Sequence, residues 1–117
     1  KLENGTYSMY HQQYRMALKL FTDVINEDPK WAEGWNKRAT LLFILGDYEK
    51  SLDDIEKVLD LEPRHFGALS GRAQIYLSLK DYEKAVDYLR KAKSIYPLIK
   101  SGENIRLIEK IIKEQQI

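Results

Sequence analysis

The chain has 117 residues, a length that suits one domain of ordinary size and is too short for two large ones. Its 44% hydrophobic and 32% charged residues exclude wholesale disorder, and 19 Lys and Arg against 18 Asp and Glu leave a net charge of +1, which gives no reason to expect a nucleic-acid or anionic-membrane partner. The absence of cysteine excludes disulfide scaffolds, thiol catalysis and thiolate metal sites.

An internal repeat of 34 residues organises the chain. The three prolines, Pro29, Pro63 and Pro97, are separated by 34 and 34 residues. The same offset places the tetrapeptide Asp-Tyr-Glu-Lys at 47–50 and again at 81–84. Self-similarity at a fixed period of roughly 20 to 50 residues is typical of repeat architectures, so the chain is predicted to be built from stacked units.

Residues 1–30 are predicted to form the first repeat. Tyr14 aligns with Tyr48 and Tyr82 at the 34-residue offset, so a second helix is expected to begin near it. The stretch before Tyr14 fits a first helix only partly, and we expect the opening turn of that helix to be absent from the sequence that starts at Lys1. We therefore expect this repeat to be shortened at its start.

Residues 31–64 are predicted to form the second repeat, with two helices joined by a turn at Gly46. Both helices have apolar residues at helical spacing on one face. These residues are Trp35, Ala39, Leu42 and Phe43 in the first helix, and Tyr48, Leu52, Ile55 and Leu59 in the second. Gly46 can end the first helix in a left-handed conformation, and Pro63 cannot continue the second.

Residues 65–97 repeat this pattern, with Lys80 in place of Gly46. The corresponding apolar residues are Leu69, Ala73, Tyr76 and Leu77, followed by Tyr82, Val86, Leu89 and Ala92. Residues 98–117 hold no further copy of the tetrapeptide, but Ile105, Ile108 and Ile112 form an apolar stripe. Because the last unit of a repeat array must cover its apolar face, this segment is predicted to be a C-terminal capping helix.

The repeat resembles the tetratricopeptide repeat family, whose 34-residue signature combines tryptophan, leucine, glycine, tyrosine, alanine, a large apolar residue and proline. The resemblance covers residues 1–97, and the matching residues are Trp35, Ala17, Ala85, Phe21, Ile55, Leu89, Pro29, Pro63 and Pro97. It implies an all-α fold, a right-handed α-solenoid of about three helix-turn-helix repeats with the capping helix at its end. It also implies that Trp35 packs between paired helices.

The chain departs from the signature at the leucine and glycine positions, which hold Arg38 with Ala39 and Arg72 with Ala73. Pentatricopeptide repeats, which bind RNA, are an alternative family of helical pairs. They have a longer period and occur in long basic arrays, so the period of 34 and the near-neutral charge favour the tetratricopeptide family.

The family resemblance also implies a binding site, because the first helix of each repeat lines a concave groove in this family. Neutral hydrogen-bonding and apolar groups at these positions suit an extended or helical peptide rather than a highly charged one. The implied groove residues are Thr6, Met9 and Tyr10 in the first repeat, Glu33, Asn36, Thr40, Phe43 and Ile44 in the second, and Ser70, Gln74, Leu77 and Ser78 in the third. Core packing is the alternative role for Tyr10, Phe43 and Leu77.

One subclass of the family holds the C-terminal carboxylate of chaperones with lysine, asparagine and arginine side chains. The residues at those positions here are Leu2, Thr6, Lys37, Gly67 and Gly71. Since only one of them is basic, a chaperone-tail adaptor is not expected.

The sequence predicts a non-enzymatic scaffold module that binds protein or peptide. It contains no phosphate-binding loop or nucleophile motif, so no catalytic residue or cofactor is expected. His11 and His65 lie in different repeats without a second metal ligand one turn away, and no metal is expected. Asp53 and Asp54 are adjacent on a helix and are predicted to lie on a solvated face.

The predicted partner is another protein or a peptide segment. Neither nucleic acid nor a membrane is expected as a partner. The longest apolar run, 41–45, is far shorter than the ~20 residues that cross a bilayer. Two alternative functions stay open, self-association into a homo-oligomer through an exposed solenoid end and recognition on behalf of a larger enzyme.

The segments 33–40 and 62–71 resemble bacterial single-domain tetratricopeptide proteins, some of which have export signals. This resemblance points to the bacterial periplasm, with the cytoplasm as the alternative.

Overall fold

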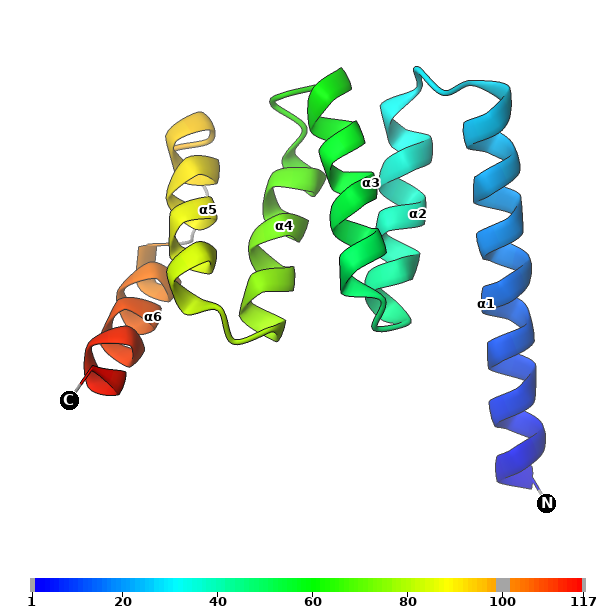
Figure 1. Ribbon diagram of the computed structural model, residues 1–117, viewed down its shortest axis with the longest axis horizontal. Coiled ribbons are helices and arrows are strands. Elements are labelled where there is room, and N and C mark those ends of the chain that lie inside the picture. The colour runs from blue at the N-terminus through cyan, green and yellow to red at the C-terminus, as the bar shows by residue number, and fades with distance from the viewer. Residues whose placement is uncertain (1, 99–101, 117) are drawn as a thin grey trace. The chain divides into compact units, whose positions relative to one another are not determined.

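The computed structural model describes residues 2–98 and 102–116, except for the side chains of 2–10 and 103. Every regular element in these ranges is an α-helix (Figure 1). The helices form two compact units, one of residues 1–61 with α1, α2 and α3, and one of residues 62–117 with α4, α5 and α6. The predicted all-α helical-repeat fold is therefore confirmed.

Helix α1 (Leu2–Glu27) is one uninterrupted helix, although the 34-residue period predicts two helices and a turn in this segment (Figure 1). The reason lies at the positions of the missing turn. Where the second repeat has Gly46 and Asp47, the first has Gln12 and Gln13. Glutamine favours the helix interior, and it supplies neither the left-handed conformation nor the N-cap that the turn requires.

Helices α2 (Ala32–Ile44) and α3 (Tyr48–Leu61) form the predicted hairpin of the second repeat. Gly46 has a φ of +82°, and its backbone N–H donates to the carbonyl of Phe43 at 3.0 Å. The N–H of Asp47 donates to the carbonyl of Leu42 at 2.9 Å. These paired bonds form the Schellman motif that ends a helix, which confirms the turn predicted at Gly46.

Small residues let α2 and α3 cross closely. Ala39 and Ser51 are almost completely buried, and the hydroxyl of Ser51 donates to the carbonyl oxygen of Ala39 at 2.6 Å. On the other side of α2, Ile25 of α1 is buried. Trp35 is half-buried rather than enclosed, and its indole N–H donates to the carbonyl of Pro29 at 2.8 Å.

Helices α4 (Phe66–Ser78) and α5 (Tyr82–Ile95) repeat this hairpin in the second unit. The turn keeps its hydrogen bonds, from the N–H of Lys80 to Leu77 and from that of Asp81 to Tyr76, although Lys80 now holds the left-handed position with a φ of +59°. His65, half-buried at the start of α4, accepts a hydrogen bond from the backbone N–H of Ala68 at 3.1 Å through Nδ1.

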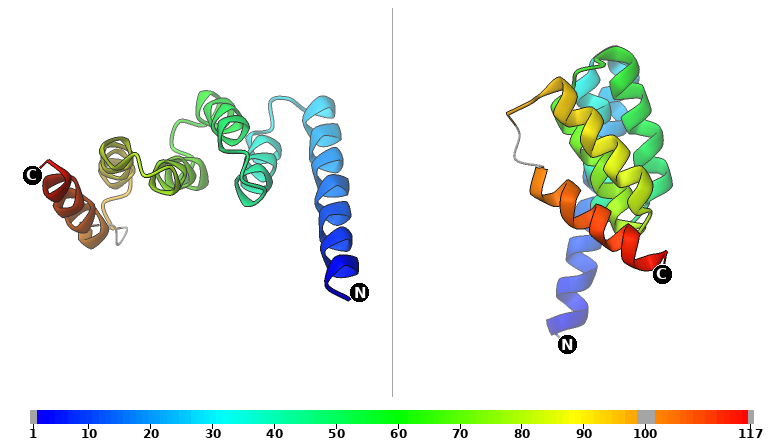
Figure 2. Two further views of the ribbon diagram at one scale, coloured as in Figure 1. Left: turned by 60° about the horizontal axis from the view of Figure 1, so that its bottom comes forward. Right: turned by 90° about the vertical axis from the view of Figure 1, so that its left-hand side faces the viewer.

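Helix α6 (Gly102–Gln115) packs beside α5, within the segment predicted as a capping helix (Figure 2). Ile105 and Ile108 are buried together with Val86 of α5. The half-buried residues around this cluster are Leu77, Tyr82, Leu89 and Ile112. The isoleucine stripe of the sequence is therefore the inward face of α6. None of the described helices has the length and apolar character that crossing a membrane would require.

Candidate functional site

The residues predicted to bind a partner on α2 and α4 occupy equivalent positions in the two repeats. Four pairs are related by the 34-residue offset, namely Asn36 and Ser70, Thr40 and Gln74, Phe43 and Leu77, and Ile44 and Ser78. Their spacing of three or four residues places each set along one side of its helix. Each set forms a row within its own unit. The α2 row consists of Glu33, Asn36, Thr40, Phe43 and Ile44, and the α4 row consists of Ser70, Gln74, Leu77 and Ser78.

The α2 row begins with Glu33, which lies in the first turn of α2. The side-chain amide of Asn36 donates to a carboxylate oxygen of Glu33 at 3.1 Å, and the hydroxyl of Thr40 donates to the backbone carbonyl of Asn36 at 3.0 Å. These bonds restrict three polar side chains before any partner arrives. A preordered surface loses less conformational entropy on binding than a mobile one.

The C-terminal end of the α2 row is apolar. Ile44 is 58% exposed, although it is a large aliphatic residue. Phe43 is half-buried, and its ring centroid lies 5.5 Å from that of Tyr48 at the start of α3. The row therefore changes from hydrogen-bonding groups to an apolar patch along one helix.

The α4 row has smaller and more polar side chains. Gln74 and Ser78 are exposed, and Ser70 is half-buried. Leu77 is half-buried against the cluster of Val86 and the α6 isoleucines, so it contributes to packing within the unit. The α4 row thus offers mainly hydrogen-bonding groups, without an exposed counterpart of Ile44.

The remaining predicted groove residues are Thr6, Met9 and Tyr10, whose side chains are not among those that the structure describes. Their backbone belongs to the uninterrupted helix α1 instead of a separate first helix.

An ion pair anchors α3 to the other side of α2. The guanidinium of Arg38 donates hydrogen bonds of 2.8 Å from Nε and Nη2 to the two carboxylate oxygens of Asp54. The bond to Asp54 raises the pKa of Arg38, against the opposing effect of burial. The prediction of a solvated face is right for Asp53, which is exposed, and wrong for Asp54, which is 4% exposed.

The hairpin of α4 and α5 has an aromatic ring at the position that this carboxylate occupies in the hairpin of α2 and α3. Tyr88 replaces Asp54 at the 34-residue offset, and the guanidinium carbon of Arg72 lies 3.9 Å from its ring centroid. Tyr88 also stacks on Tyr76, with 5.4 Å between ring centroids and 28° between planes. The two hairpins are therefore held by different chemistry at one position.

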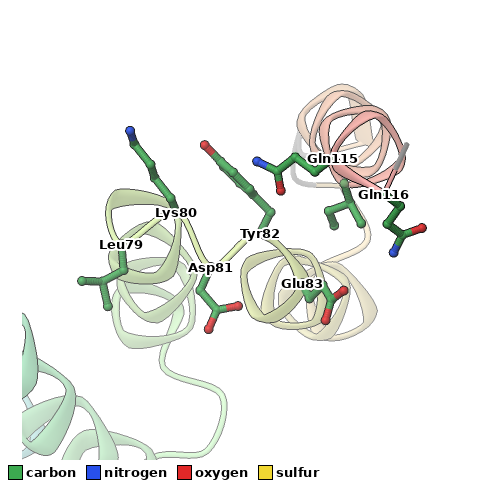
Figure 3. Close-up of a pocket in the computed structure, with 8 residues that line it drawn as sticks. Leu79, Lys80, Asp81, Tyr82, Glu83, Gln115 and Gln116 are labelled. Atoms are coloured by element: carbon green, nitrogen blue, oxygen red, sulfur yellow. The ribbon is translucent and has the colours of Figure 1, made fainter.

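A recess of about 400 Å³ lies between the α4–α5 turn and the end of α6 (Figure 3). The side chain of Gln115 reaches toward Tyr82, whereas the carboxylates of Asp81 and Glu83 point to the opposite side. Sequence reasoning did not find this recess, because its two walls are about 30 residues apart in the chain. The amide of Gln115 and the hydroxyl of Tyr82 suit hydrogen bonding to a partner.

A second recess, of about 490 Å³, lies within the first unit on the side of α2 opposite the α2 row. Helices α1, α2 and α3 form its walls. The lining residues are Leu18, Thr22, Arg38, Leu42, Leu45, Asp47, Lys50, Asp53 and Asp54. Across the part of the chain that the structure describes, no group of three or more His, Cys, Asp and Glu side chains is arranged to hold a metal ion.

Comparison with known proteins agrees with these repeats. Residues 36–98, more than half of the chain, match the model of the tetratricopeptide repeat family. A tetratricopeptide-repeat-containing protein of Rhizobium etli is 50% identical over 46 residues, which cover 39% of this chain and 22% of that protein. The match therefore spans less than a quarter of that relative's length.

Solved structures share the fold at low sequence identity. The first tetratricopeptide domain of Spaghetti (RPAP3), bound to the HSP90 peptide SRMEEVD, is 20% identical with a TM-score of 0.78, covering 95% of this chain and 89% of that one. The TPR2B domain of yeast Sti1, in complex with pHsp70, is 22% identical with a TM-score of 0.73, covering 95% and 91%. At such identities the likeness concerns the fold alone.

Proposed function

Since this chain belongs to the tetratricopeptide repeat family, we propose that it is a non-catalytic module that binds a segment of another protein on the α2 row. The observation that carries the proposal is the exposed side of α2 itself. There, hydrogen bonds preorder Glu33, Asn36 and Thr40 next to the 58% exposed side chain of Ile44. The α4 row supplies a second, more polar contact.

The chemistry of the rows selects the kind of segment. Glu33 is the one charged residue of the two rows, and the neighbouring Lys37, outside the α2 row, carries the opposite charge. A segment with neutral polar side chains and one apolar anchor for Ile44 fits such a surface better than an acidic tail. The similar domains named above were solved with HSP90 and Hsp70 ligands. Among the positions that hold the chaperone carboxylate in one subclass of the family, Lys37 is the one basic residue here, and Gly67 and Gly71 carry no charge. We therefore propose that recognition does not depend on a C-terminal carboxylate.

A transplant between repeats tests the α2 row. Asn36→Ser, Thr40→Gln and Ile44→Ser together give α2 the residues that α4 carries at the same positions, so the fold should tolerate them. Peptides selected from a random display library on the wild-type chain are measured by fluorescence anisotropy against this variant. We expect a loss of affinity of at least about tenfold.

The matched control is Asp60→Asn, an exposed position on α3. It should leave the affinity unchanged. Equal affinity of the wild type and the transplant variant would show that the α2 row is not the binding surface. Selected peptides that lose binding when their C-terminus is amidated would contradict carboxylate-independent recognition.

Self-association is a second candidate, and an exposed side of α1 favours it. Met16 and Leu20 are 66% and 60% exposed, one helical turn apart. An apolar stripe of this kind is a common site of helix pairing. Sedimentation should show an oligomer that Leu20→Lys dissociates, whereas Leu107→Lys, at a similarly exposed leucine on α6, leaves it intact. A wild-type chain that stays monomeric over a wide concentration range would remove this candidate.

A further inference from the structure

The recess between α1, α2 and α3 corresponds to a place that aromatic rings occupy in the second unit. Two of its lining residues, Leu42 and Asp54, align at the 34-residue offset with Tyr76 and Tyr88. In the second unit those two tyrosines stack on each other. An isobutyl group and a carboxylate replace two phenol rings in the first unit, and about 490 Å³ of space remains beside them.

The groups that hold the rings in the second unit also have counterparts around this recess. Arg72 lies over Tyr88, and the ammonium of Lys84 lies 5.4 Å from the ring centroid of Tyr76. The equivalents of these cations, Arg38 and Lys50, both line the recess. The first unit therefore keeps the two cations and lacks the two tyrosine rings. The guanidinium of Arg38 already lies 5.3 Å from the ring centroid of Trp35, so Lys50 is the cation that would meet a further aromatic face.

The side chains that line the recess indicate which chemical group would bind in it. Leu18, Leu42 and Leu45 supply apolar contact. Three carboxylates, from Asp47, Asp53 and Asp54, outnumber the two cations. Asp54 is paired with Arg38, and Asp47 lies 3.8 Å from the ammonium of Lys50. The exposed carboxylate of Asp53 can accept a hydrogen bond from a phenol O–H, whereas the excess of negative charge would repel a phosphate group.

We propose that this recess binds the side chain of a tyrosine from a partner protein, taking the place that the chain's own tyrosines fill in the second unit. The site lies on the side of α2 opposite the α2 row. It is therefore independent of the peptide-binding function proposed above. Its ligand class is an unmodified tyrosine, and phosphorylation of that tyrosine is expected to prevent binding.

The probes are N-acetyl-tyrosinamide, N-acetyl-phenylalaninamide and N-acetyl-phosphotyrosinamide, each titrated into the full chain while amide chemical shifts are followed by NMR. We expect saturable shifts in the α1–α3 unit, near Leu42 and Asp54, with dissociation constants in the millimolar range for one side chain. The tyrosine probe should bind about threefold to tenfold more tightly than the phenylalanine probe. The phosphotyrosine probe should not saturate.

Two variants close the recess in different ways. Leu42→Tyr with Asp54→Tyr transplants the rings of the second unit, and Leu45→Trp covers the rim at a residue that is already 38% exposed. Leu45→Trp leaves the ion pair of Arg38 and Asp54 in place, so it still tests the recess if the double variant fails to fold. Each folded variant should bind the tyrosine probe at least tenfold more weakly, whereas Leu107→Tyr on α6 should bind it as the wild type does.

Three results would overturn the proposal. These are the absence of saturable shifts, shifts that map away from the recess, and unchanged binding in both folded variants. The α2-row transplant variant distinguishes this site from the peptide-binding function. It should bind the tyrosine probe normally even when it no longer binds the selected peptides, and a joint loss of both would mean that the two surfaces are one site.

Discussion

Arg38 on α2 and Asp54 on α3 form a two-point ion pair in which both carboxylate oxygens accept hydrogen bonds of 2.8 Å. The side chain of Asp54 is 5% exposed and that of Arg38 is 22% exposed, so water screens the pair only in part. Charge-assisted bonds of this geometry are stronger than neutral ones. This pair is therefore a strong polar contact between α2 and α3, in addition to the hydrogen bond from Ser51 to Ala39.

Replacing Asp54 with Asn keeps the size of the side chain and removes its charge. Arg38 then loses its counter-ion and one of two good acceptors, since the amide group has one oxygen. We expect the free energy of unfolding to fall by about 1–3 kcal/mol in urea titrations. The neighbouring Asp53→Asn is the control, because Asp53 is exposed and should change stability by less than about 0.5 kcal/mol. Equal effects at both positions would contradict the role of the pair.

The pH dependence of this effect follows from the raised pKa of Arg38. A group with a raised pKa in the folded state contributes stability that is fully present below its unfolded pKa and is lost as the pH rises through its folded pKa. The difference between the wild type and Asp54→Asn should therefore be constant from about pH 7 to about pH 10, well below the range in which arginine titrates. A difference that declines within this window would indicate another origin for the stabilisation.

The sequence predicts the repeat well because its signals are local. The turn at Gly46 and the isoleucine stripe of α6 depend on residues close together in the chain, and the 34-residue period is a regularity of the sequence itself. The turn, the stripe and the two hairpins, α2–α3 and α4–α5, appear in the structure. The uninterrupted α1 was predictable too. Gln12 and Gln13 stand where a turn needs Gly and Asp, so the residues at these positions contradict the turn that the period alone predicts.

The ion pair and the recess, which the sequence does not predict, depend on contacts between helices. Asp54 and Arg38 are 16 residues apart, and only the crossing of α2 and α3 brings them together. The one sequence feature that indicates this ion pair is a charged residue, Arg38, on the apolar side of a predicted first helix. The recess beside Asp54 also escapes sequence reasoning, because a space is visible only after α1, α2 and α3 are in place. The rows on α2 and α4 remain predictions about binding.

Glycine should have opposite effects in the turn between α4 and α5 and in the interior of α5. Lys80 holds a left-handed conformation with a φ of +59°, which costs a residue with a Cβ about 1 kcal/mol or more relative to glycine. Lys80→Gly should therefore stabilise the chain by about 0.5–1 kcal/mol in thermal or urea unfolding. Lys91→Gly, the same change inside α5, should destabilise it by about 1 kcal/mol. Loss of stability in Lys80→Gly would contradict the strained turn.

The indole of Trp35 contributes a hydrogen bond that its ring alone cannot replace. Its N–H donates to the carbonyl of Pro29 at 2.8 Å, which ties α2 to the connection that precedes it. Trp35→Phe keeps a ring and loses the donor, so we expect the free energy of unfolding to fall by about 1–2 kcal/mol. Trp31→Phe is the control, because Trp31 is 47% exposed, and it should have little effect. If the two variants unfold at the same urea concentration, the bond to Pro29 contributes nothing.

The two faces of α6 should respond differently to truncation. Ile108 is 5% exposed and packs with Ile105 and Val86, so Ile108→Ala removes buried methyl groups and leaves a cavity between α5 and α6. We expect a loss of about 2–4 kcal/mol in the stability of the second unit. Leu107, one residue earlier, is 58% exposed, and Leu107→Ala should cost less than about 0.5 kcal/mol. Hydrogen exchange of α5 amides locates the effect, because a helix that caps α5 must protect it. Unchanged α5 exchange in Ile108→Ala would mean that α6 covers the end of the repeat without stabilising it.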